Sequence, residues 1–369
     1  MAAETRPPSA TIAFPILAIA FVFLAPVIGF DAGAQPPTPF SLSLSAAMVV
    51  IMFGAVFAAV YHADVIAHRV GEPFGTLVLT MAVTIIEVAL IESIVLTPGS
   101  SPALARDTVF AVIMIVCNGL VGLCILWGGL RHHEQEFQTS GTSVYLSVLG
   151  ALSVLTLVLP NYTATTIGPY FSNAQLVFVS IVTAVLYVAF LFIQTYRHMD
   201  YFRADSDSPP GENHVYPSNR AVAISVTMLL VALCGVILIA KKFAIILEIG
   251  LSIVGAPPAV AGIIIAIVVL APESITAVRA AQRNELQKSL NLALGSSLAT
   301  IGLTIPAVSV LAIALGQRLE LGVDMHDTVL LVLTFAISLV TFGGGRTNIL
   351  PGFVHLVLFA VFVFMVFVP

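Results

Sequence analysis

The chain has 369 residues, of which 59% are hydrophobic and only 9% are charged, and its mean hydropathy is +1.07. Soluble domains carry about 25% charged residues, so this composition excludes an ordinary soluble globule and predicts that lipid surrounds most of the chain. The formal net charge of -5 is small and gives no indication of a nucleic-acid partner.

Apolar runs of membrane-spanning length, or close to it, follow one another along the whole chain. Runs this long, with few charges inside them, are typical of helices and not of the alternating strands of a membrane barrel. The sequence therefore predicts an all-α polytopic membrane protein with eleven spans. The predicted spans are residues 11–30, 42–62, 74–96, 108–129, 144–160, 173–195, 220–240, 258–281, 288–315, 327–342 and 350–368.

Two segments are less clear than the others. The first apolar run is followed by AGAQ at 32–35, which resembles a signal-peptidase site, but the run is long for a signal peptide and a retained helix is favoured. Residues 241–257 (KKFAIILEIGLSIVGAP) are ambiguous, and an interfacial or re-entrant segment is the interpretation considered for them.

The positive charges predict the orientation of the spans. If the connections alternate between two sides, the side of the N-terminus holds ten Lys and Arg residues and the other side holds four. This asymmetry predicts a cytoplasmic N-terminus and an external C-terminus. The four residues on the external side are Arg106, Lys241, Lys242 and Arg318.

A polar stretch at residues 196–219 divides the chain, and its Asp, Ser, Pro and Gly content is typical of a disordered cytoplasmic linker. It follows an N-terminal tail and extra helix (1–41) and a first set of five spans (42–195), and it precedes a second set of five (220–369). Because five is odd, homologous halves would lie in the membrane with opposite orientations, as in many secondary transporters.

Two isolated carboxylates lie at corresponding places in these halves. Glu87 lies in the second span of the first half, and Glu273 lies in the second span of the second half. Each is about 20 Å along its helix, near the middle of the bilayer, where an ionised group costs several kcal/mol. A pair of such carboxylates can be neutralised by a hard cation or by protons. Competition between the two ligands is the coupling that antiport requires.

Other polar groups in or near the spans are weaker candidates. Pro272 lacks an N–H and so frees the carbonyl of Val268, which predicts a broken helix with a backbone oxygen exposed to an ion, with a kinked packing helix as the alternative. Five further residues are interpreted either as lining the ion site or as helix-packing residues: Thr80, Thr84, Asn118, Ser296 and Ser297.

Two acids and two histidine motifs complete the candidates. Glu92 is interpreted as a vestibule (entrance) or snorkelling acid, and Glu248 as a solvated loop acid, with a vestibule acid as the alternative for Glu248. The stretches HADVIAH (62–68) and HHEQE (132–136) resemble ligand sets but are interpreted as solvated loops at the membrane edges.

Residues 268–306 resemble the second α-repeat of the calcium/proton antiporters, in the cation/calcium exchanger superfamily. The shared pattern is a mid-membrane Glu followed twenty-two residues later by Gly-Ser-Ser, here Glu273 and Gly295-Ser296-Ser297. Residues 75–93 resemble the first α-repeat, with Glu87 at its acidic position, and the bacterial Cha-type antiporters are the most similar group. The resemblance implies ion-binding motifs at about 75–129 and 258–315, and gating by reciprocal sliding of two helices.

The chain departs from many members of that family. Where they carry an Asn three residues before each acid, this sequence has Thr84 and Leu270. The ion shell therefore has fewer side-chain oxygens, and Na⁺ or K⁺ stays open beside Ca²⁺, as in Cha-type relatives.

The resulting hypothesis is a secondary antiporter that exports cytosolic Ca²⁺ in exchange for protons. The alternative is a Na⁺(K⁺)/H⁺ antiporter on the same scaffold. An intramembrane enzyme is a remote alternative, because the sequence contains no Gly-x-Ser-x-Gly or His-Glu-x-x-His motif. No cofactor is predicted, and the oligomeric state stays open.

Overall fold

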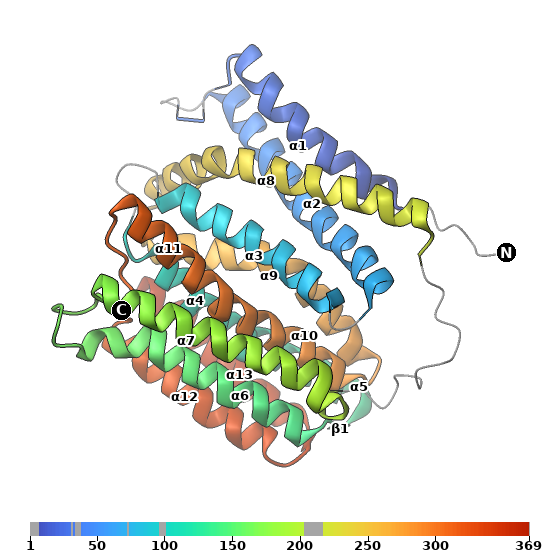
Figure 1. The fold of residues 1–369 in the computed structure, drawn as a ribbon, viewed down its shortest axis with the longest axis vertical. Coiled ribbons are helices and arrows are strands. Elements are labelled where there is room, and N and C mark those ends of the chain that lie inside the picture. The colour runs from blue at the N-terminus through green and yellow to red at the C-terminus, as the bar shows by residue number, and fades with distance from the viewer. Residues whose placement is uncertain are drawn as a thin grey trace. The chain divides into compact units, whose positions relative to one another are not determined.

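The structure is a computed structural model that describes residues 7–30, 32–33, 38–71, 74–95, 101–202 and 217–368, and it is almost entirely helical (Figure 1). Two features of the sequence therefore lie outside the described residues: the end of the AGAQ stretch and residues 203–216 of the predicted linker.

The helices, in chain order, are α1 (Ser9–Val27), α2 (Pro39–Val70), α3 (Phe74–Val95), α4 (Leu104–Met114), α5 (Val121–His132), α6 (Thr139–Ser153), α7 (Asn173–Phe192), α8 (Asn219–Val254), α9 (Ala259–Gln282), α10 (Leu286–Ala299), α11 (Ile305–Leu315), α12 (Met325–Phe342) and α13 (Ile349–Phe367). The π-helical segments η1 (Ile115–Leu120), η2 (Val154–Val158), η4 (Ile193–Arg197) and η6 (Thr300–Thr304) continue α4, α6, α7 and α10, and η3 (Leu159–Tyr162) and η5 (Met199–Tyr201) are 3₁₀ turns. The strands β1 (Gln135–Glu136) and β2 (Arg346–Thr347) form one antiparallel pair, with Gln135 opposite Thr347.

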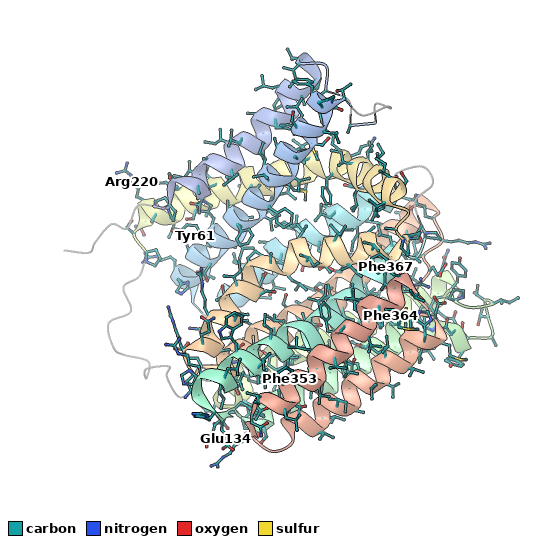
Figure 2. The ribbon with its side chains drawn as sticks, turned by 180° about the vertical axis from the view of Figure 1, so that it is seen from behind. Tyr61, Glu134, Arg220, Phe353, Phe364 and Phe367 are labelled. Carbon is teal, nitrogen blue, oxygen red and sulfur yellow. The ribbon has the colours of Figure 1, made fainter. Side chains whose placement is uncertain are left out.

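The predicted fold class is confirmed. Within the described ranges, ten helices are long and apolar enough to cross a membrane, and the 22-residue helix α3 fills the predicted span at 74–96. Outward-facing aromatic side chains on α13 are typical of a lipid-facing surface (Figure 2): Phe353, Phe364 and Phe367 are 50%, 60% and 54% exposed.

The prediction for residues 241–257 is wrong. Helix α8 runs without a break from Asn219 to Val254 and ends at Gly255, whose φ of 64° is left-handed. No proline lies within α8, and the helix continues through Gly235, the Lys241–Lys242 pair and Gly250. A 36-residue helix is about 54 Å long, well above the roughly 30 Å of a bilayer core. The segment is therefore the far end of a long helix.

The chain forms two compact units, Met1–Ser100 with Pro210–Ala256, and Ser101–Pro209 with Pro257–Pro369. The first unit contains α1, α2, α3 and α8, and the second contains the other helices. Each unit takes spans from both predicted halves. The two compact units therefore do not coincide with the predicted repeats, 42–195 and 220–369. The repeats remain a prediction from the sequence.

In the first unit, α1 packs closely against α2 and α8. A Cβ atom on Gly54 would lie 2.2 Å from the Phe14 ring, and one on Gly235 would lie 2.8 Å from the Cβ of Ala18. Glycines at these two positions therefore allow the helices to approach, as small residues do in membrane bundles.

A buried histidine joins the same three helices, and the prediction that residues 62–68 form a solvated loop is wrong. His62 lies inside α2 and is 0% exposed. Its Nε2 donates to the carbonyl of Thr11 at 3.0 Å, and its Nδ1 lies 3.1 Å from the Ser225 hydroxyl. The Thr11 carbonyl is free for this bond because Pro15, four residues later in α1, has no N–H.

Replacing His62 with phenylalanine is expected to lower the free energy of unfolding by about 1–3 kcal/mol, because the part-buried Thr11 carbonyl loses its donor. Thermal unfolding in detergent measures the change. His68→Phe on the same helix is the matched control, because the His68 side chain is 67% exposed. Equal unfolding temperatures for the two variants would contradict the proposed role of His62.

In the second unit, two contacts bring helices close enough to require glycine. A Cβ on Gly262 in α9 would lie 2.8 Å from backbone atoms of Asp107 and Thr108 in α4. A Cβ on Gly122 in α5 would lie 3.0 Å from the carbonyl oxygen of Gly352 in α13. The first contact positions α9, which carries Glu273, against α4, and the second joins α5 to α13.

Candidate functional site

Glu273 is buried in the second unit, within α9. It is 8% exposed, and its Oε2 atom has no hydrogen-bond partner among the described residues. A buried polar atom without a partner carries a large desolvation cost, so such an atom is typical of a strained or functional position. The carboxylate therefore has the capacity to bind a cation or a proton.

The broken helix predicted at Pro272 is not observed. Helix α9 is continuous from Ala259 to Gln282, with Pro272 inside it. The proline still removes one backbone donor, so the carbonyl of Val268 loses its usual partner one turn earlier. Val268 and Pro272 are both buried, and their ion-lining role stays a prediction.

The Gly-Ser-Ser motif lies level with Glu273 on the adjacent helix. Helices α9 and α10 form an antiparallel hairpin. Glu273 is about 14 Å from the end of α9, and Ser297 is about 17 Å from the start of α10, at 1.5 Å per residue. Ser297 is 0% exposed, its hydroxyl has no partner among the described residues, and Ser296 is half-buried. The hairpin thus places the Glu273 carboxylate and the Ser297 hydroxyl at about the same depth along the two helices.

The π-helical segment η6 begins three residues after Ser297. Such segments widen a helix by one residue per turn and are frequent at functional sites. A second π-helical segment, η1, lies in the corresponding span of the first half.

In the first unit, Glu87 lies in the middle of α3 and is 1% exposed. Thr84, one turn earlier, is 8% exposed, and Thr80 is half-buried. Glu92 is also half-buried, nearer the end of α3. The two predicted carboxylates therefore belong to different compact units, each inside an apolar span, and their pairing remains a prediction.

Asn118, a predicted ion-lining residue, lies in η1 and is 0% exposed. Its Nδ2 donates to the hydroxyl of Thr334 in α12 at 2.8 Å, and its Oδ1 lies 3.2 Å from Nδ1 of His355 in α13. His355 Nε2 lies 3.1 Å from the Thr341 hydroxyl. Both ends of the amide are thus used within the bundle, which favours a structural role for Asn118.

Sequence reasoning missed His355, although the signal was present. A single histidine lies six residues into the last apolar run, and such a residue needs polar partners that only other helices can supply. Its partners come from α12 and η1, which the sequence alone did not bring together.

Comparison with known proteins decides the family. A model described as sodium/calcium exchanger protein matches residues 40–196 and 224–368. The chain belongs to this family. The ionic transporter y4hA of Sinorhizobium fredii is 47% identical over 86% of this chain and 87% of its own length. The sodium-potassium/proton antiporter ChaA of Escherichia coli is 34% identical over 99% of this chain and 98% of its own length.

The fold of this exchanger-family member also resembles a solved structure. The native YfkE structure superposes with a TM-score of 0.71 at 17% identity, over 97% of this chain and 100% of that chain. This likeness shows a shared fold, and the family model and the two relatives confirm the predicted family.

Glu248 and Gln135 of the HHEQE motif of this family member are not loop residues, whereas His133 and Glu134 are exposed in the connection between α5 and β1. Glu248 is half-buried in α8, and the motif spans the end of α5 and strand β1. Within the motif, Gln135 is 2% exposed. A solvated loop is therefore wrong for Glu248 and for this buried glutamine, because a helix and a strand pair enclose them.

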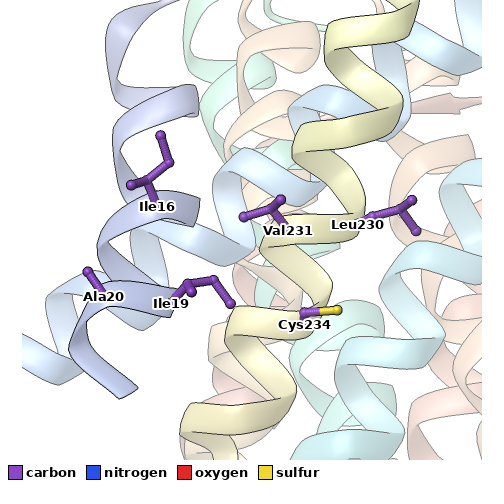
Figure 3. A pocket seen from close by; sticks show the side chains of 6 residues that line it. All are labelled: Ile16, Ile19, Ala20, Leu230, Val231 and Cys234. Carbon is purple, nitrogen blue, oxygen red and sulfur yellow. The ribbon is translucent and has the colours of Figure 1, made fainter. Parts of the chain in front are cut away.

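Two other places in the structure are less suited to the exchanged cation. A groove of about 510 Å³ between α1 and α8 is lined by Ile16, Ile19, Ala20, Leu230, Val231 and Cys234 (Figure 3), which offer no oxygen ligand. At the start of α12, ligand atoms of Asp324, His326 and Asp327 lie within 4.8 Å of one another, but these side chains are exposed or half-buried.

Several charged side chains near the cluster of Asp324, His326 and Asp327 are paired in salt bridges. Arg106 pairs with Glu320 at 2.6 Å and with Asp107 at 2.8 Å. Desolvation and the Glu320 carboxylate raise the pKa of the neighbouring Tyr170 hydroxyl. The arrangement ties α4 to the α11–α12 connection.

Proposed function

We propose that this chain is a secondary cation/proton antiporter in which Glu87 and Glu273 alternately bind cation and protons. The observation that carries the proposal is the buried Glu273 carboxylate, whose Oε2 lacks a partner among the described residues, level with the unpaired hydroxyl of Ser297. Two carboxylates in an apolar bundle are stable when loaded with a cation or protonated, and unstable when empty and ionised. A carrier with this property moves only when loaded, and it acts as a transporter and not as an enzyme.

Ca²⁺ is the first candidate for the exchanged cation, because two carboxylates match the charge of a divalent ion and supply up to four of its six to eight oxygens. The hydroxyls of Thr80, Thr84 and Ser296 and the Val268 carbonyl are proposed to contribute further oxygens. The proposed direction is export of cytosolic Ca²⁺ in exchange for protons. Na⁺ or K⁺ is the second candidate, and it is favoured by the similarity to a sodium-potassium/proton antiporter.

The connections between helices support the proposed inverted repeats, 42–195 and 220–369. Strand β1, after the third span of the first half, pairs with β2, after the fourth span of the second half. Conversely, Tyr170, after the fourth span of the first half, bridges to Glu320, after the third span of the second half. Halves with the same orientation would place these partners on opposite sides of the membrane.

The same pairings agree with the alternation of connections between two sides. The β1–β2 pair, with Arg346 and Glu136, joins two connections that the sequence assigns to the cytoplasmic side, and the Tyr170–Glu320 bridge joins two that it assigns to the external side. The proposed location is a bacterial inner membrane, with the N-terminus and the 196–219 linker in the cytoplasm and the C-terminus outside.

The antiport proposal is tested in proteoliposomes with an acidic interior. Ca²⁺, Na⁺ or K⁺ is added outside, and internal pH and cation uptake are followed together. Proton exit driven by Ca²⁺ is the expected result. Proton exit with Na⁺ or K⁺ alone would support the second candidate, and the absence of proton movement with every cation would contradict antiport.

A further inference from the structure

The turn between α9 and α10 joins the two helices that carry Glu273 and Ser297. The α5–α6 connection holds this turn through side chains. Gln135 Nε2 donates to the carbonyl of Ala281 at 3.0 Å and to Asn284 Oδ1 at 3.1 Å. His132 Nε2 lies 3.0 Å from the carbonyl of Gln282. The last carbonyls of a helix lack partners within it, so these two side chains cap the C-terminus of α9 from another segment.

The first turn of α10 is held from the same connection. Gln287 is 5% exposed, and its Oε1 accepts a hydrogen bond from the backbone N–H of Gln138 at 2.8 Å. Its Nε2 donates to Asn291 Oδ1 at 2.9 Å, and Asn291 in turn donates to the carbonyl of Phe202. The hairpin is thus bound on both sides of its turn.

Gln135 is itself fixed in place. It belongs to β1, opposite Thr347 in β2. Its amide lies across Gly128 of α5, where a Cβ would lie 1.7 Å from Gln135 Oε1. This Oε1 is buried with no partner among the described residues, which is unfavourable. The two bonds that Nε2 donates to the α9–α10 turn offset that cost, and a glutamate could not donate them.

We propose that Gln135 is a positioning residue for the ion site. By holding the α9–α10 turn, it sets the depth and register of α9 against α10, and hence the alignment of Glu273 with Ser297. Ligand groups that bind an ion must be held to within about 0.5 Å by the residues that support them. The inference rests on the proposed antiport function, because it assigns Gln135 to that same site.

The test compares Gln135→Met, which keeps the length of the side chain and removes its amide, with Gln138→Met. The Gln138 side chain is exposed, and only its backbone takes part in the contacts to the turn. In proteoliposomes, Gln135→Met is expected to raise the KM for the exchanged cation about 5- to 10-fold, with a smaller change in maximal rate. Gln138→Met is expected to match the wild type. Gln135→Glu, which loses the donors but keeps the shape, is expected to behave like Gln135→Met.

A double-mutant cycle with Ser297→Ala separates positioning from general destabilisation. Because Gln135 acts through the alignment of the two helices, its effect on KM is expected to shrink when the Ser297 hydroxyl is absent. If Gln135→Met does not fold, Gln287→Met tests the same turn from α10, and the same rise in KM is expected.

Each outcome is decisive. An unchanged KM in the folded Gln135 variant, or full additivity with Ser297→Ala, would overturn the positioning role. An unchanged KM in Gln287→Met would do so if that variant is the one tested. A wild-type protein without cation/proton exchange would instead contradict the proposed function itself.

Discussion

Replacing Glu273 with glutamine is expected to reduce cation/proton exchange at least about 100-fold, because removing one buried charged partner of a bound ion costs several kcal/mol. The buried side chain keeps nearly the same volume, and its amide carries no charge to desolvate. The variant is therefore expected to fold with an unfolding temperature at least equal to that of the wild type. Exchange in proteoliposomes and thermal unfolding in detergent, measured on the same preparation, check both parts.

The matched control is Glu134→Gln, because Glu134 is exposed on the α5–β1 connection (Figure 2). This control is expected to exchange at the wild-type rate. Glu87→Gln is expected to be as inactive as Glu273→Gln, since antiport through a pair requires both carboxylates. Substantial exchange by either buried variant would show that the pair is not the shared site of cation and proton.

Replacing Gly262 with leucine is expected to lower the free energy of unfolding by about 2–4 kcal/mol, or to prevent folding. Even the first side-chain atom would lie 2.8 Å from backbone atoms of Asp107 and Thr108, and a backbone moves only with its helix. Helices α4 and α9 would have to separate. Thermal unfolding in detergent and the yield of folded protein measure the effect.

Gly250→Leu is the control for that substitution. Gly250 also lies inside a helix, α8, but a Cβ there would meet no atom within 4 Å. Leucine has the higher helix propensity, so this variant is expected to be as stable as the wild type. If Gly262→Leu were equally stable, the close approach of α4 and α9 would be refuted.

The carboxylates were predictable because they break a local pattern. Glu87 and Glu273 are isolated acids within long apolar runs, and a charge is costly at such a position. Both are buried, at 1% and 8% exposure. Their burial agrees with the prediction, whereas their binding of an ion remains a proposal.

The partners of other polar residues were not predictable. His62 bonds to Thr11, 51 positions away, and His355 contacts Asn118, 237 positions away. The sequence predicts a solvated loop at 132–136, whereas Gln135 is buried against the α9–α10 turn. In each case, the hydrogen-bond partner and the burial of the residue depend on a segment that is distant in the sequence.

The sequence by itself determined the helical spans, because lipid offers the backbone no hydrogen bonds and a long apolar run must satisfy its own. It also determined the two mid-span carboxylates and the similarity that placed the chain in its family. Only the tertiary structure decided which helices form each compact unit, the unbroken course of α8 and the polar partners of His62, Asn118 and Gln135. The physical reason is that hydropathy is a local property of the chain, whereas each buried polar group is satisfied by whichever helix packs beside it.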